Sequence, residues 1–170
     1  MLNQINWLEG FEPGNTDNFV SNEIIIKGVT AQTAWKYIVD TKLWPLYYDN
    51  VSKIELENNS NYLVNELKFN FNTFEFLVQA QVKELQAPTE TSPGRIGWYG
   101  LCAGDENNRL EVYHAFLFEN VANDCVRILT QETQIGKPGQ EMALQKPNPM
   151  LNAHQDWLEG IASVIKKELN

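Results

Sequence analysis

Apolar and polar residues alternate along most of the chain between positions 51 and 134. A period of two is typical of half-buried β-strands. Clusters of Asn, Gly, Pro and Thr separate the alternating runs, and connections this short pair consecutive strands antiparallel. The pattern therefore predicts a six-stranded meander, with strands over residues 51–56, 62–70, 74–85, 95–103, 109–119 and 125–134.

Further elements flank this meander. Residues 23–27 contain three consecutive Ile and predict a strand. Thr30 can cap a helix over 31–40, and Pro45 breaks that run and leaves one short helical turn. Pro149 suits the first position of a long amphipathic helix capped by Asn148. We therefore predict an α+β fold: a curved antiparallel sheet of six to seven strands wrapped around a long C-terminal helix, with two short helices after the first strand.

Residues 1–20 show no sustained period, so we expect an irregular N-terminal arm, docked through Trp7 and Phe11. No repeat, low-complexity tract or linker divides the rest, and residues 1–170 are expected to form a single domain. At 170 residues, of which 43% are hydrophobic, the chain can close a core without a metal or a disulfide.

Charge narrows the expected partners. The 13 Lys and Arg against 22 Asp and Glu leave a net charge of -9, which excludes nucleic acid as an expected partner. No apolar run approaches the roughly 20 residues of a transmembrane helix, and the first residues do not resemble a secretory signal. Cys102 and Cys125 fit a reduced, cytoplasmic protein better than a disulfide scaffold. The sequence does not determine the oligomeric state, which is either a monomer or a homodimer.

Candidate chemistry lies inside the predicted sheet. Alternating Phe residues on three strands either fill a core or form the walls of a ligand cavity under the last helix. His114 shares a strand face with Val112 and Phe116 and should point the same way. A turn near Ala122 would place Thr130 opposite His114 and make Glu132 its diagonal neighbour.

The role of this pair stays open at this point. A carboxylate beside an imidazole raises its basicity, as a general base requires, but the pair would serve equally as a structural hydrogen bond. His154, on the apolar stripe of the last helix, would line the cavity or cap the helix–sheet seam. With two His and no clustered Cys, no metal site is expected. Arg127 is expected to face solvent, opposite the apolar face of its strand.

Several motifs carry a resemblance to a known family: Trp44-Pro45-Leu46-Tyr47-Tyr48, Ile96-Gly97-Trp98, Tyr113-His114-Ala115-Phe116 and His154-Gln155-Asp156-Trp157-Leu158. In their order and spacing the chain resembles the START/Bet v 1-like (SRPBCC) superfamily, and more narrowly its bacterial polyketide cyclase/dehydrase-like branch. The resemblance implies a helix-grip fold with a cavity for a hydrophobic or aromatic molecule. It implies no particular reaction, because the superfamily includes carriers, receptors, cyclases and chaperone-binding domains.

Three functions follow as hypotheses. The first is binding of a small hydrophobic or aromatic molecule, a lipid included, between the sheet and the C-terminal helix. The second is a polyketide cyclase/dehydratase-type enzyme with His114 and Glu132 as catalytic residues, and the third is a chaperone-activator-like interaction module. No cofactor is expected, and whether the chain is an enzyme is left open. The candidate ligand-binding residues are Phe69, Phe71, Phe74, Phe76, Trp98, Tyr113, His114, Phe116, Glu132, His154 and Trp157.

Overall fold

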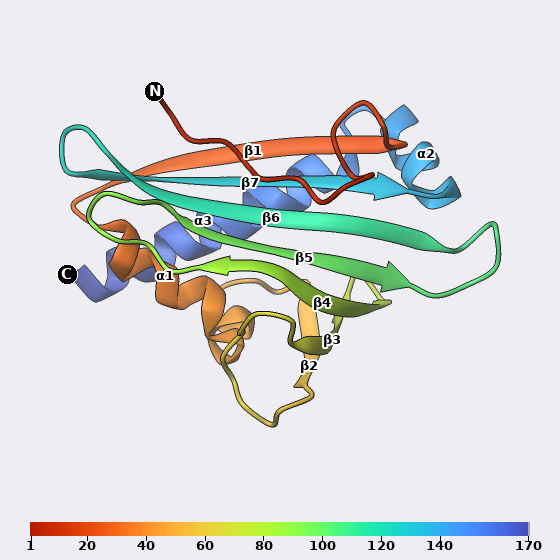
Figure 1. The fold of residues 1–170 in the computed structure, drawn as a ribbon, viewed down its shortest axis with the longest axis horizontal. Helices are drawn as coiled ribbons and strands as arrows, with labels where there is room; N and C mark the ends of the chain where they lie inside the picture. The colour runs from red at the N-terminus through yellow and green to blue at the C-terminus, as the bar shows by residue number, and fades with distance from the viewer. Residues whose placement is uncertain (170) are drawn as a thin grey trace.

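A seven-stranded antiparallel sheet curves around the long C-terminal helix α3 (Figure 1). The computed structural model describes residues 1–169. The sheet order is β1-β7-β6-β5-β4-β3-β2, so the first strand closes the meander by pairing with the last. The strands are β1 (Asn18–Lys27), β2 (Val51–Leu56), β3 (Lys68–Thr73), β4 (Phe76–Gln86), β5 (Gly94–Cys102), β6 (Leu110–Val121) and β7 (Cys125–Ile135).

Four helical segments complete the fold: α1 (Ala31–Val39), the 3-10 helix η1 (Thr41–Leu46), α2 (Lys137–Leu144) and α3 (Pro149–Leu169). The Thr30 Oγ1 accepts a hydrogen bond from the N–H of Thr33 at 3.2 Å and caps α1. The Asn148 Oδ1 accepts one from the N–H of Met150 at 3.1 Å and caps α3. Within residues 1–169, no helix is long and apolar enough to cross a membrane.

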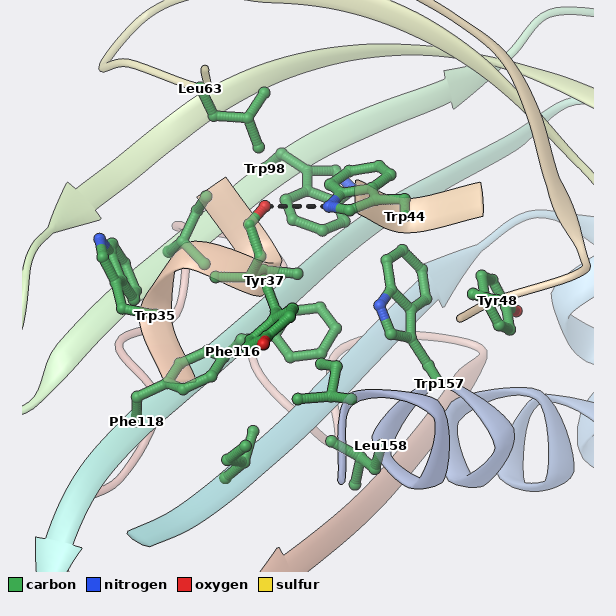
Figure 2. Packing of buried hydrophobic residues seen from close by; sticks show 14 of the residues in the cluster. Trp35, Tyr37, Trp44, Tyr48, Leu63, Trp98, Phe116, Phe118, Trp157 and Leu158 are labelled. Carbon is green, nitrogen blue, oxygen red and sulfur yellow. Dashed lines mark hydrogen bonds between the residues drawn. The ribbon is translucent and has the colours of Figure 1, made fainter. Parts of the chain in front are cut away.

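The concave face of the sheet packs against α1, η1 and α3 through an aromatic core (Figure 2). Trp44 is fully buried at its centre, and its indole N–H donates a hydrogen bond to the carbonyl of Ile38 at 3.0 Å. The ring of Trp157 on α3 meets Trp44 edge to face, with centroids 5.2 Å apart. Such pairs stabilise a core beyond the area they bury, so the two tryptophans fix η1 against α3.

The N-terminal segment before β1 crosses the opposite face of the sheet, in front of the strands in Figure 1. It covers Arg127 of β7, whose guanidinium lies 2.7 Å from both Glu119 and Glu23 and donates to the carbonyl of Asn3 at 3.1 Å. Arg127 is only 8% exposed, so the expectation that it faces solvent is wrong. The physical reason is that a segment without its own periodicity covers this face and supplies partners for the charge.

The predicted α+β helix-grip architecture is confirmed, with four local differences. β1 starts at Asn18 instead of 23, because a polar stretch also pairs with β7. β3 starts at Lys68 instead of 62, because a turn at Asn65 and Glu66, where Glu66 has a φ of 62°, interrupts the predicted strand. α2 was not predicted, because its eight residues contain Pro138 and Gly139 and bury little apolar surface. Cys102 and Cys125 are both free.

The fourth difference is the register of the β6–β7 hairpin. Asn123 and Asp124 adopt left-handed backbone conformations, with φ of 65° and 57°, and Val121 pairs with Cys125. His114 therefore lies opposite Glu132, and Thr130 lies opposite Phe116. The predicted pairing of His114 with Thr130 is wrong by two residues, because the turn is centred one position later than expected. Both registers keep His114 and Glu132 on the same face.

Candidate functional site

A cavity of about 380 Å³ lies between the concave face of the sheet, α2 and the N-terminal half of α3. This volume falls in the usual range for pockets that bind small molecules. Most of its walls are apolar or aromatic, as in Phe71, Val78, Trp98, Val112 and Trp157. The cavity can therefore surround a compact apolar molecule.

Half-exposed apolar side chains mark the rim of this cavity. Phe74 and Phe76, in and beside the β3–β4 turn, are 44% and 51% exposed and still contribute to its lining. The turn is tight because Phe74 and Glu75 both take left-handed conformations. Met142 of α2 and Met150 of α3 contribute flexible side chains to the same lining, and thioether side chains adapt well to different apolar shapes.

Three ionisable side chains meet in the lining of the cavity and are defined here as the polar cluster: His114 of β6, Glu132 of β7 and His154 of α3. The Glu132 Oε2 lies 3.2 Å from Nδ1 of His114 and 3.4 Å from Nε2 of His154. The two imidazole rings stack with centroids 4.4 Å apart and an interplanar angle of 10°. All three side chains are buried, and the cluster connects the sheet to α3 inside the fold.

A chain of amide side chains connects Glu132 to the cap of α3. The N–H of Met150 donates to Oδ1 of Asn148, which leaves the Asn148 amide nitrogen to donate to Oδ1 of Asn18 at 2.7 Å. The Asn18 nitrogen then donates to Gln134 Oε1 at 2.7 Å, and the Gln134 nitrogen donates to Glu132 Oε1 at 2.5 Å. Because a backbone N–H can only donate, the direction of every bond in this chain is determined. The last bond of the chain is donated by Gln134, so Oε1 of Glu132 is an acceptor.

The environment of the polar cluster sets its protonation. Burial and the neighbouring His154 lower the pKa of His114 and Glu132 raises it by less, so that the pKa falls to about 3. Burial alone would raise the pKa of the Glu132 carboxyl, but the contacts with both imidazoles and Gln134 outweigh burial and lower it. His114 lies between two polar partners: its Nδ1 is 3.2 Å from the Glu132 carboxylate, and its Nε2 is 2.8 Å from the Thr130 hydroxyl, which also lies 3.2 Å from the carbonyl of Ala115. At neutral pH the cluster thus holds a carboxylate beside a neutral His114.

The same three side chains bring potential metal ligands within 4.8 Å of one another. An ion bound by imidazole lies close to the plane of each ring. The rings of His114 and His154 stack with nearly parallel planes, so their in-plane lone pairs do not converge on one point. One ring would have to rotate before both could bind the same ion, and the observed arrangement does not fit a metal centre.

The structure brings most of the predicted ligand-binding residues together. Eight of them line the cavity: Phe71, Phe74, Phe76, Trp98, His114, Glu132, His154 and Trp157. Phe69 and Phe116 lie in the aromatic core and do not contribute to the lining. Tyr113 points to the opposite face of the sheet, where it packs against Trp7 and Phe11 of the arm. The prediction that Tyr113 contributes to the site is therefore corrected. Tyr113 directly precedes His114 in the sequence, and adjacent residues of a strand face opposite sides of the sheet.

Sequence reasoning missed other residues of the cavity. Gln134 lies two positions after Glu132 on one strand, so the alternation that placed Glu132 could also have placed Gln134. Met142 had no such signal, because α2 was not predicted. A larger, open hollow of about 910 Å³ over β2 to β5 includes Glu55, Lys68 and Tyr99 but no buried titratable group. The smaller cavity is therefore the candidate site.

Comparisons with known proteins agree with this fold. No protein-family model and no curated protein matches the chain. Among solved structures, the hypothetical protein jhp0584 from Helicobacter pylori is 41% identical, with a TM-score of 0.92 over 96% of this chain and 97% of that one.

More distant structures share the fold. The di-domain ARO/CYC BexL from the BE-7585A biosynthetic pathway is 9% identical, with a TM-score of 0.63 over 88% of this chain and 46% of its own. A point mutant of Thalictrum norcoclaurine synthase, in complex with a transition-state analogue, is 12% identical, with a TM-score of 0.61 over 90% of this chain and 96% of its own. At such identities the likeness concerns the fold alone. The chain belongs to the family of the Helicobacter pylori protein jhp0584, and its fold is that of START/Bet v 1-like (SRPBCC) proteins.

Proposed function

We propose that this protein binds a small apolar or aromatic molecule in the cavity between the sheet and α3. The observation that carries the proposal is an aromatic cavity of about 380 Å³ with a buried polar cluster in its lining. Apolar walls provide affinity through the hydrophobic effect, and a few polar groups orient the ligand. The solved structure of norcoclaurine synthase with a transition-state analogue supports small-molecule binding by this fold.

A catalytic role for His114 as general base is less well supported. A general base works best when its pKa lies near the working pH. Burial lowers the pKa of His114 to about 3, so its neutral imidazole is a weak base at neutral pH. Its Nε2 is also occupied by the Thr130 hydroxyl at 2.8 Å. These features favour a ligand-binding and structural role over proton abstraction.

The first test is native mass spectrometry of the freshly purified protein, compared with the same sample denatured. Extra mass that is lost on denaturation would reveal a co-purified ligand and indicate its class. The second test measures binding of the neutral probe 2-naphthalenemethanol by isothermal titration calorimetry. The wild type should bind this probe, because a bicyclic aromatic alcohol suits the volume and walls of the cavity.

Two variants locate the binding site. Val112→Phe adds volume to the lining and should weaken binding of the probe about tenfold or more, because the ring fills space that the probe needs. Tyr113→Phe changes the opposite face of the sheet and should bind as the wild type does. Circular dichroism would check that both variants fold. Absence of both a co-purified ligand and probe binding would refute the proposal, as would equal binding by Val112→Phe.

A further inference from the structure

The fixed charges of the cavity lining are all negative. Of the residues that line it, Glu132 and Glu141 carry carboxylates, and the lining includes no Lys or Arg within residues 1–169. Glu132 is 5% exposed, whereas Glu141 is exposed to solvent. Apart from the two imidazoles that contact it, the buried Glu132 carboxylate has no Lys or Arg among the described lining residues to balance its charge.

The amide chain from α3 keeps this charge in place. Each amide from Asn148 through Asn18 to Gln134 is oriented by the one before it, beginning at the backbone N–H of Met150. A protonated Glu132 would need an acceptor for its proton, but Gln134 presents a donor to Oε1. Gln134 donates to Oε1 and both imidazoles contact Oε2, and together these contacts lower the pKa of Glu132 and favour its ionised form.

Other groups in the lining also favour a positively charged donor. His154 is 2% exposed, and its Nδ1 is buried without a hydrogen-bond partner. The other ring nitrogen, Nε2, lies 3.4 Å from Glu132, so Nδ1 is the ring atom that a bound polar group could contact. Tyr48 and Trp157 stack in the lining with centroids 4.4 Å apart, and the faces of such rings attract cations.

We propose that the cavity selects an apolar or aromatic amine in its protonated form, with the ammonium group toward Glu132, and rejects the matching carboxylic acid. The inference rests on the proposed function, because it specifies the ligand of the same cavity. A bound ammonium would neutralise the buried charge of Glu132. A bound carboxylate would place a second negative charge beside Glu132, and the lining within residues 1–169 supplies no Lys or Arg to compensate it.

The test compares three probes of the same size: 2-naphthylmethylamine, 2-naphthalenemethanol and 2-naphthoic acid. Calorimetry at neutral pH and moderate ionic strength should rank the amine first, the alcohol second and the acid last. The amine should bind about tenfold or more tightly than the acid, because Coulomb interactions are stronger near a buried carboxylate in an apolar cavity than in bulk water. Equal affinities, or tighter binding of the acid, would overturn the inference.

The variant Glu132→Gln removes the charge and keeps the shape of the side chain. Its ratio of amine to alcohol affinity should fall to within about threefold of unity, because Coulomb attraction is lost while apolar burial remains. Glu159→Gln, an exposed change of the same type on α3, should leave the wild-type ratio intact. An amine preference that survives in Glu132→Gln would contradict the assignment to Glu132.

The outcomes separate this inference from the function on which it rests. Binding of the alcohol without preference for the amine would overturn the inference and leave the ligand-binding function standing. Binding of none of the three probes would count against both. If Glu132→Gln does not fold, the ranking of the three probes by the wild-type protein still decides the question.

Discussion

Gly160 of α3 lies close to the backbone of Tyr47 at the end of η1. A Cβ atom at this position would overlap the backbone oxygen of Tyr47 and lie 3.1 Å from its carbonyl carbon. A backbone oxygen cannot rotate away as a side chain can. Tyr47 is also held in place, because its hydroxyl donates to the carbonyl of Tyr37 at 2.5 Å and accepts from the indole N–H of Trp157 at 3.3 Å. The variant Gly160→Ala should therefore force α3 away from η1.

Two opposing effects set the size of the change. Alanine favours a helix interior over glycine by about 1 kcal/mol. Forcing extra volume into a well-packed contact costs roughly 1–3 kcal/mol, and the upper end applies here because the obstacle is backbone. Gly160→Ala should therefore lower the free energy of unfolding by about 2 kcal/mol. For a chain of this length, that loss corresponds to a fall in Tm of about 4–8 °C.

Differential scanning calorimetry at neutral pH would measure this shift. Ser163→Ala is a matched control, because it makes a helix-favouring change on the exposed side of α3 and should leave Tm unchanged or slightly higher. Gly160→Ala should also weaken binding of 2-naphthalenemethanol, because Trp157 lines the cavity. A Gly160→Ala protein as stable as the wild type would refute the close packing of α3 on η1.

Two further predictions concern buried ionisable side chains. Because the pKa of His114 is lowered from its usual 6.5 to about 3, the unfolded chain takes up a proton that the folded chain excludes. The contribution of the neutral His114 to the free energy of unfolding is therefore complete above about pH 6.5, and it is lost as the pH falls toward 3. Between about pH 7.5 and pH 5 the wild type should lose about 2 kcal/mol more than His114→Gln in urea titrations, and parallel losses would contradict this. Arg127→Met leaves the buried Glu119 without its cation and should cost about 2–3 kcal/mol of unfolding free energy, most of it recovered in the double variant Arg127→Met/Glu119→Leu. A single variant as stable as the wild type would show that the ion pair contributes nothing.

Local signals in the sequence determined the positions of most elements. Thr30 and Asn148 cap the helices that they were predicted to cap, because capping depends on residues within one helical turn. Alternation also placed His114 and Glu132 on one face of the sheet, because a period of two is a property of each strand alone. The fold class was therefore available from the sequence.

Tertiary structure decided which residues meet across the sheet. The left-handed turn at Asn123 and Asp124 determined the register, and a turn centred one residue away shifts every opposite pair by two. The N-terminal arm decided that Arg127 and Tyr113 are buried, although strand periodicity alone turns them away from the core.

The charge of the cavity likewise depends on tertiary structure. The ionised form of Glu132 rests on its contacts with His114 of β6, His154 of α3 and Gln134 of β7, which come from separate segments of the chain. Sequence patterns of short period determine which face of an element is buried. They carry no information on which distant segment covers the other face, or which polar groups meet there, because those contacts form only when the whole chain folds.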